Sequence, residues 1–275
     1  MGRKVVFFDI DGTLWDFHMT IPESTREAIR RIRAAGNLAF VNSGRTRAFI
    51  NSEKLLSLGF DGIVSGCGTM IEWNPDGRDL AVDIRPEDVL YYHRLPRDIC
   101  LRTVETVRRH RFRPILEGRN NLYMEFSEFE KEPYGELVIK AMGDKLLPLM
   151  DFWGEWEISK LSCDTENIET SACFAELSDL YDFLIHDQKV VEFVPKGFDK
   201  AKGLLHVLEL LGIDLSDSYA VGDSVNDLGM LRAAGTGIAM GDGTDAAKKA
   251  ADYVTAPLHE DGIYRAMDHF GLMNG

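Results

Sequence analysis

The sequence predicts an α/β protein, in which a doubly wound parallel sheet carries a smaller inserted α+β domain. Short apolar runs recur in both ends of the chain, and each breaks into Gly, Ser, Asn or Asp. Such runs are typical of strands buried on both faces of a parallel sheet, and helical stretches lie between them. From about residue 85 to residue 188 this pattern is lost. We therefore expect a core of residues 1–84 and 190–275 and an inserted domain of residues 85–189.

The expected strands of the core end in polar residues. The first run, VVFF (5–8), leads directly into Asp9 and Asp11, and similar runs occur in LAFVNSGR (38–45), GIVSGCG (62–68), YAVGDSVND (219–227) and GIAMGDG (237–243). Right-handed crossovers make such strands parallel, and ligands bind outside their carboxyl ends. We therefore expect side chains far apart in the sequence to converge on one edge of the sheet, namely Asp9, Asp11, Ser43, Asp223 and Asp227.

Helices are expected between these strands. Ser24 can cap a helix through TREAIRRIRAA (25–35), and Gly36 stands where its C-terminal cap belongs. A second helix should begin near Val225 and stop at Gly235. The insert instead shows amphipathic stretches that predict helices at residues 98–110, 134–142 and 176–187, and strand-like runs at residues 121–126 and 155–163.

Composition and charge exclude several functional classes. The chain has 275 residues and a net charge of -14, which argues against a nucleic-acid-binding surface. We expect no membrane segment, because no apolar stretch approaches the ~20 residues that cross a bilayer. The four cysteines form no CxxC, which favours reduced thiols and a cytoplasmic location, and the seven histidines form no HExxH zinc motif. The chemistry is therefore expected to come from carboxylates.

Several carboxylates at one edge cannot all stay ionised without a cation. A site of oxygen ligands suits Mg²⁺, which shares its coordination between carboxylates and a substrate phosphate. This indicates phosphoryl transfer, with Asp9 as the nucleophile and Asp11 as the general acid and base. Gly12 permits a tight turn and a close backbone approach to the phosphate, and Thr13 can hydrogen-bond within the loop.

At this point the residues match a known family. DIDGT (9–13), NSGR (42–45), a lysine near residue 200 and GDSVND (222–227) resemble the four motifs of the haloacid dehalogenase superfamily of phosphatases. The large insertion between the second and third motifs resembles the Cof-like branch, whose α/β cap domain lies there. One departure is that residues 42–43 are Asn-Ser where Ala-Thr is more usual.

The resemblance implies a role for each acidic motif residue. Asp9 would be the nucleophile and a Mg²⁺ ligand, and Asp11 the acid and base, with its backbone carbonyl on the metal. Asp223 would ligate Mg²⁺, and Asp227 would bind or orient the metal shell.

The resemblance also implies contacts to the phosphoryl group. Ser43 would hydrogen-bond it beside the Gly44 amide, and Asn226 would contact it or the active-site lysine. The family's motif places that lysine at Lys200, with Lys202 as the alternate.

These motifs predict a cytosolic, Mg²⁺-dependent phosphatase that acts on a small phosphorylated metabolite, such as a sugar phosphate, as a monomer or homodimer. Two alternatives stay open. A phosphomutase would return the phosphoryl group to another substrate hydroxyl, and a catalytically silent protein would only bind the phosphometabolite. The insert carries no motif that identifies the substrate.

Overall fold

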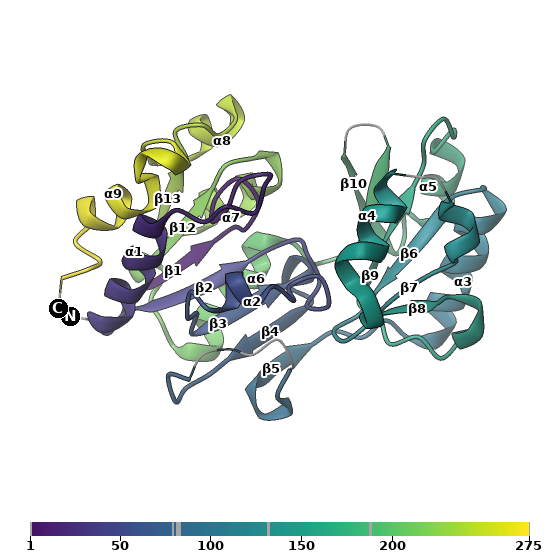
Figure 1. The fold of residues 1–275 in the computed structure, drawn as a ribbon, viewed down its shortest axis with the longest axis horizontal. Coiled ribbons are helices and arrows are strands. Elements are labelled where there is room, and N and C mark those ends of the chain that lie inside the picture. The colour runs from purple at the N-terminus through teal and green to yellow at the C-terminus, as the bar shows by residue number, and fades with distance from the viewer. Residues whose placement is uncertain (1, 79, 81–83, 131–132, 187–188, 275) are drawn as a thin grey trace. The chain divides into compact units, whose positions relative to one another are not determined.

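The computed structural model describes residues 2–78, 80, 84–130, 133–186 and 189–274, which form two compact units (Figure 1). The core unit comprises Met1–Gly44, Asn51–Tyr92 and Asp199–Gly275, and the insert unit comprises Arg45–Ile50 and His93–Phe198. Both units mix helices with strands, and the predicted α/β class is confirmed.

The core unit is built on an eight-stranded sheet within the described residues. Its strands lie in the order β14-β13-β12-β1-β2-β3-β4-β5. Neighbours from β14 to β3 are parallel, and β4 and β5 add antiparallel strands at one edge. The bounds are β1 Val5–Phe8, β2 Leu38–Asn42, β3 Gly62–Ser65, β4 Met70–Trp73, β5 Val89–Tyr92, β12 Ser218–Gly222, β13 Thr236–Ala239 and β14 Tyr253–Val254.

The central strands of this sheet end together. Every residue of β1 is buried, as expected for an uninterrupted apolar run covered on both faces. Phe8, at the end of β1, pairs with Val221 of β12 on one side and Val41 of β2 on the other. The polar residues that follow these three strands therefore leave the sheet at the same edge.

The helices of the core unit are α1 Glu23–Ala34, α2 Glu53–Leu56, α6 Lys200–Leu211, α7 Leu228–Ala233, α8 Asp245–Ala250 and α9 Gly262–His269. Gly36 follows α1 with φ +83°, and its amide donates to the Arg33 carbonyl, as a C-terminal cap should. The predicted Ser24 cap is wrong. The N-cap residue is Pro22, and Ser24 lies inside the first turn. Proline's fixed φ suits the extended N-cap conformation, so the helix starts before the serine.

The insert unit has its own sheet of six described strands, in the order β10-β11-β9-β6-β7-β8. The strands are β6 Arg113–Glu117, β7 Leu122–Met124, β8 Leu146–Pro148, β9 Lys160–Asp164, β10 Tyr181–His186 and β11 Val190–Pro195. Its helices are α3 Arg97–Arg109, α4 Pro133–Met142 and α5 Ser171–Leu177. The helices predicted at residues 98–110 and 134–142 are therefore present.

One predicted helix of the insert is wrong. Residues 176–187 were expected to be helical, yet α5 ends at Leu177 and Tyr181–His186 form β10. The stretch is rich in aromatic and aliphatic residues, and β10 pairs along its whole length with antiparallel β11. This pairing overrides the local amphipathic pattern. The run predicted as a strand at residues 155–163 also begins later, at Lys160.

The two units divide at residues other than those predicted from the sequence. β5, placed in the insert by the prediction, pairs with β4 in the core sheet. β11, placed in the core, pairs with β9 and β10 in the insert sheet. The short segment Arg45–Ile50 also belongs to the insert unit. There Ala48 packs with Ile115 and Leu122 in an apolar cluster.

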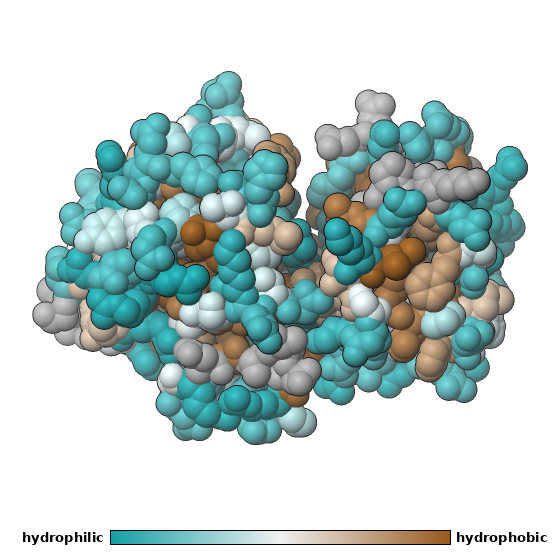
Figure 2. All heavy atoms as spheres, viewed as in Figure 1, coloured by the Kyte–Doolittle hydropathy of each residue, from teal (hydrophilic) through white to brown (hydrophobic). Residues whose placement is uncertain are grey.

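In Figure 2, hydrophilic side chains dominate the visible face of the core unit, whereas the insert unit shows apolar side chains gathered near its middle among hydrophilic ones. Among the described residues, no helix has both the length and the apolar character needed to span a bilayer.

Candidate active site

Three aspartates meet where β1 and β12 end. Asp9 follows β1 directly, Asp223 follows β12, and Asp227 closes the 3-10 turn Val225–Asp227 that comes next. One carboxylate oxygen from each lies within 4.8 Å of the others. Asp9 and Asp227 are almost fully buried, at 3% and 0% exposure. The predicted convergence of these three side chains is therefore what the structure shows.

The loop after β12 is built around the Asp227 carboxylate. Its Oδ2 accepts hydrogen bonds from the backbone amides of Asp223 and Ser224, both at 3.0 Å. Gly222 makes room for this arrangement, because a Cβ there would lie 2.6 Å from Asp227 Cγ. The GDSVND segment thus folds back on its own last aspartate, which fixes where Asp223 points.

The turn after β1 is fitted against Asp223. Gly12 adopts φ +78°, and a Cβ at this position would lie 2.5 Å from Asp223 Oδ2. The buried hydroxyl of Thr13 donates to Asp223 Oδ1 at 3.1 Å. Only glycine combines the left-handed backbone with this close approach. The sequence predicted a tight turn at Gly12, and the structure supplies a second reason for glycine, the neighbouring carboxylate.

Lys200 joins this group from the first turn of α6. Its Nζ lies 2.6 Å from Asp9 Oδ1 and 2.7 Å from Asp227 Oδ1. Asp199 caps the helix by accepting from the Lys202 amide at 2.6 Å. Helix geometry then turns Lys200 inward and leaves Lys202 exposed. Of the two candidate lysines, the structure brings Lys200 to the aspartates.

The electrostatics of the group are unbalanced towards negative charge. Burial, reinforced by Asp227, raises the pKa of Asp9 to about 8 despite the opposing ammonium of Lys200. Burial likewise raises the pKa of Asp223 to about 6, with Asp227 again adding to the shift. Burial opposes the charge of Lys200, but Asp227 and Asp9 outweigh it and raise its pKa. One lysine therefore does not compensate three carboxylates, and a divalent cation with oxygen ligands would.

Asp11 stands apart from this cluster. It is exposed, and its Oδ1 accepts a hydrogen bond from the indole Nε1 of Trp15 at 2.9 Å. Asp11 is close enough to Asp9 to raise the pKa of Asp9 slightly. The two aspartates of the DIDGT motif thus lie in different surroundings, one buried beside a lysine and the other at the surface.

The remaining predicted residues lie around the same edge. Ser43, just after β2, is buried, and its backbone carbonyl accepts from the Cys67 amide at 3.0 Å. Gly44 follows it and is half-buried. Asn226 is exposed, and its Oδ1 accepts from the Ser224 hydroxyl at 2.6 Å, within the same loop after β12.

Sequence reasoning missed two contributors. Trp15 was not singled out, although it holds Asp11. Asn42, noted only as a departure from the usual motif, is fully buried and donates from Nδ2 to the Lys200 carbonyl at 2.8 Å. This hydrogen bond joins residues 158 positions apart in the sequence and holds the start of α6 against the end of β2. The only available signal was a polar residue at the end of an otherwise apolar strand.

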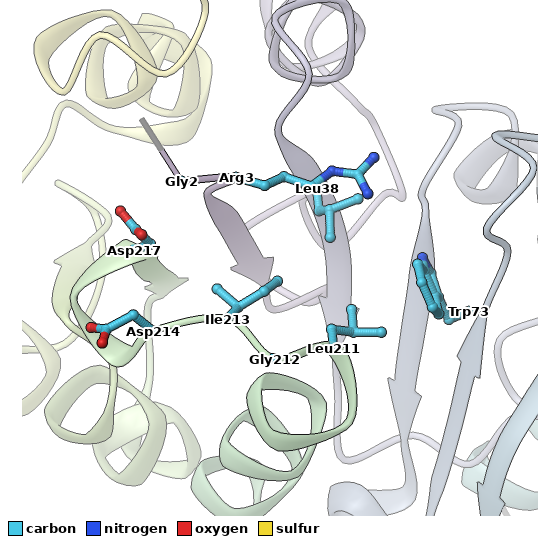
Figure 3. Close-up of a pocket in the computed structure, with 9 residues that line it drawn as sticks. All are labelled: Gly2, Arg3, Leu38, Trp73, Leu211, Gly212, Ile213, Asp214 and Asp217. Carbon is cyan, nitrogen blue, oxygen red and sulfur yellow. The ribbon is translucent and has the colours of Figure 1, made fainter.

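A separate pocket of about 360 Å³ lies at the other end of the sheet (Figure 3). It is lined by residues that precede or begin strands β1, β2 and β12, such as Arg3, Leu38 and Asp217, and by Trp73 and the segment Leu211–Asp214. None of the clustered aspartates contributes to it. Because ligands of such sheets bind at the carboxyl ends of strands, the aspartate edge is the candidate active site.

The chain is similar to known proteins over nearly its whole length. The haloacid dehalogenase-like hydrolase family matches residues 6–267. YkrA of Bacillus subtilis (strain 168), whose name calls it a phosphatase only provisionally, is 30% identical over 99% of this chain and 100% of its own length. YitU of the same strain, named a 5-amino-6-(5-phospho-D-ribitylamino)uracil phosphatase, is 26% identical, covering 98% of each chain. The solved structure of the sugar phosphatase BT4131, titled a HAD subclass IIB enzyme, superposes with a TM-score of 0.76 at 29% identity, covering 98% of this chain and 99% of that one.

Proposed function

Because this chain belongs to the haloacid dehalogenase-like hydrolases and is a phosphatase of phosphoric monoesters, we propose that it works through an aspartyl-phosphate on Asp9 with Mg²⁺ as its metal. The observation that carries the proposal is the surroundings of Asp9. Its carboxylate is buried at a strand end, 2.6 Å from the Lys200 ammonium and within 4.8 Å of oxygens from Asp223 and Asp227. Asp9 would thus be a nucleophile with the Lys200 ammonium fixed beside it, and the neighbouring carboxylates of Asp223 and Asp227 could bind Mg²⁺.

Two displacements at phosphorus complete the reaction. In the first, an Asp9 oxygen forms a bond to phosphorus, the ester P–O bond breaks, and Asp11 gives its proton to the departing alkoxide. In the second, Asp11 takes a proton from water as the water oxygen bonds to phosphorus, which releases inorganic phosphate and restores the Asp9 carboxylate. The two surroundings described above suit these roles, since proton exchange needs the accessible Asp11 and attack needs the fixed Asp9.

The residues present fit a Mg²⁺ ion. The donors are carboxylate oxygens, and burial without a cation raises the pKa of Asp9 and Asp223, so the group favours a hard cation. Asp9, Asp223 and Asp227, with the backbone carbonyl of Asp11, would hold it. When bound, the ion would offset negative charge on the transferring phosphoryl group. Lys200 adds a second positive charge on the Asp9 side, and Ser43, Gly44 and Asn226 would supply polar contacts to the phosphoryl oxygens. Gly12, whose amide donates to the Trp15 carbonyl, contributes the tight turn beside them.

The proposed substrate is the phosphate ester of a short polyhydroxylated carbon chain. Two similar proteins are named for such substrates, a phosphoribityl compound and a sugar phosphate. We propose that the insert unit acts as a cap that selects among these small phosphates. A net charge of -14 would also disfavour large polyanions as substrates.

The test is phosphate release from a panel of sugar, polyol and nucleotide phosphates with Mg²⁺. We expect turnover of at least one sugar or polyol phosphate, and a loss on the order of 10⁴-fold or more for Asp9→Asn, because the nucleophile is removed. Asp217→Asn, in the pocket at the opposite end of the sheet, is the matched control and should keep full activity. Equal inactivity of wild type and Asp9→Asn on every substrate would reject the proposal. A requirement for a bisphosphate activator with little phosphate release would instead establish a phosphomutase.

A further inference from the structure

Asn42, the last residue of β2, uses only one side of its side-chain amide. Its Nδ2 donates to the Lys200 carbonyl at 2.8 Å and contacts Met230 Sδ at 3.5 Å. Its Oδ1 has no hydrogen-bond partner among the described residues, although the side chain is fully buried. A buried acceptor without a partner lowers stability, because the hydrogen bonds that it makes to water in the unfolded chain are lost. Stability alone therefore does not account for an asparagine at this position.

The hydrogen bond from Asn42 is also not needed to satisfy the backbone. Lys200 is the first residue of α6, and helix geometry directs the amide four residues later towards its carbonyl. The Asn42 amide is therefore a second donor to this carbonyl, and it ties the first helical residue to the end of β2. The side chain of that same residue reaches the cluster, with Nζ 2.6 Å from Asp9 Oδ1.

The first turn of α6 also rests closely on the neighbouring strand β3. A Cβ at Gly203 would lie 2.6 Å from Val64 Cγ1 and 3.0 Å from Gly68 Cα, so only a glycine lets the helix come this near. Such packing sets the distance between helix and sheet, whereas a hydrogen bond is directional and also restrains sliding and rotation of the helix. Asn42 supplies that directional contact at the turn that carries Lys200.

We propose that Asn42 is a positioning residue, which fixes the first turn of α6 so that the Lys200 ammonium stays beside Asp9. This inference rests on the proposed function, in which Asp9 is the nucleophile and Lys200 its neighbouring positive charge. Asn42 acts only through the Lys200 backbone and takes no part in bond making or breaking. Its unpaired Oδ1 is a cost in stability that the position of Lys200 offsets in activity.

The test compares activity and stability in two variants that both lack the donor. Asn42→Ala and Asn42→Leu change the side-chain volume in opposite directions, so an effect that they share belongs to the lost hydrogen bond. We expect kcat to fall about tenfold in both and KM to change less than about threefold, because a charge beside the nucleophile is displaced. The Tm of Asn42→Ala should stay within about 2 °C of wild type, since the unpaired acceptor is removed together with the donor.

Asn37 is the matched control at the other end of β2. Its side chain is half-buried and paired on both sides, with Nδ2 donating to the Leu272 carbonyl at 2.9 Å and Oδ1 accepting from the Lys4 amide at 3.1 Å. Asn37→Ala should therefore show the opposite result, a Tm lowered by about 4 °C and an unchanged kcat. Purely structural asparagines would instead lose activity only as far as they lose stability.

A double-mutant cycle shows whether Asn42 acts through Lys200. In a Lys200→Met background, Asn42→Ala should lower kcat less than about twofold further, because the charge that it positions is gone. An unchanged kcat in Asn42→Ala, opposite effects of Ala and Leu, or a tenfold loss that persists in the Lys200→Met background would overturn the inference and leave the phosphatase mechanism in place. Failure of the proposed function would show differently, as a wild-type enzyme no more active than Asp9→Asn.

Discussion

Among the described residues, each unit holds a lysine buried between two carboxylates, and only one of these clusters has the features of an active site. In the core unit, Lys200 lies between Asp9 and Asp227. In the insert unit, Lys160 of β9 lies between Glu117 of β6 and Glu192 of β11. The side chains of both lysines are 2% exposed. Burial of an ion pair therefore does not by itself mark function.

The difference lies in how far each cluster compensates its own charge. In the insert, burial would raise the pKa of Glu192, but Lys160 and His186 outweigh it and lower that pKa to about 2. Burial raises the pKa of Glu117 against the opposing ammonium of Lys160, so this lysine faces two carboxylates where Lys200 faces a group of three. In the core, burial and the Asp227 charge outweigh the Thr13 hydroxyl and Lys200 at the third carboxylate, Asp223, so its pKa is raised together with that of Asp9. A cluster that balances its charge can be structural, whereas an unbalanced one requires a ligand.

The largest expected effect comes from breaking the core cluster. Lys200→Met should lower kcat on the order of 10³-fold, because a preorganised positive charge beside Asp9, the proposed nucleophile, is lost. Lys202→Met is the control, two residues along the same helix and exposed, and should change kcat less than about twofold, as a surface substitution does. Phosphate-release kinetics of both variants check this. Equal losses in the two variants would mean that the helix, and not the Lys200 charge, matters.

The matching change in the insert should act on stability. Lys160→Met leaves Glu117 buried without its ammonium and Glu192 with His186 as its remaining described partner, so we expect the free energy of unfolding of the insert to fall by about 3 kcal/mol. Denaturant unfolding followed by a spectroscopic probe in the insert measures this effect. Adding Glu192→Gln to Lys160→Met should recover part of the loss, because the uncompensated charge is then removed. If the Lys160→Met protein were as stable as the wild type, the cluster of Lys160, Glu117 and Glu192 would not stabilise the insert.

Much of the core unit could be predicted from the sequence because its signals are local. An apolar run ending in aspartate predicts both the strand and the edge at which it ends, and Asp9, Asp223 and Asp227 lie together as expected. The insert was less predictable. Tyr181–His186 form a strand through pairing with β11, which an amphipathic pattern does not reveal.

Side-chain contacts between residues far apart in the sequence could not be predicted either. The bond from Asn42 to the Lys200 carbonyl joins residues 158 positions apart, and nothing near Asn42 indicates it. The balance of the two lysine clusters likewise depends on neighbours brought together by sheet pairing, such as Glu117 and Lys160 on adjacent strands β6 and β9.

The smallest expected effect is on the pH dependence of stability, and it distinguishes the two clusters by their response to a cation. Asp9 and Asp223 have raised pKa values of about 8 and about 6 in the folded protein, against about 4 when unfolded. Between pH 4 and 8 the folded protein thus binds more protons than the unfolded chain, so the free energy of unfolding of chelator-treated protein falls as pH rises. A cation must displace these protons, so its binding strengthens over the same range.

We therefore expect Mg²⁺ to raise Tm by about 2–4 °C more at pH 8 than at pH 6, measured against chelator-treated protein at each pH. Glu117→Gln should keep this difference, because the insert cluster balances its charge without a cation. Asp9→Asn should reduce it, since one of the displaced protons belongs to that carboxylate. If Mg²⁺ raised the Tm of the wild type by the same amount at both pH values, the aspartates would not lose protons when the cation binds. The excess negative charge would then have to be compensated within the protein.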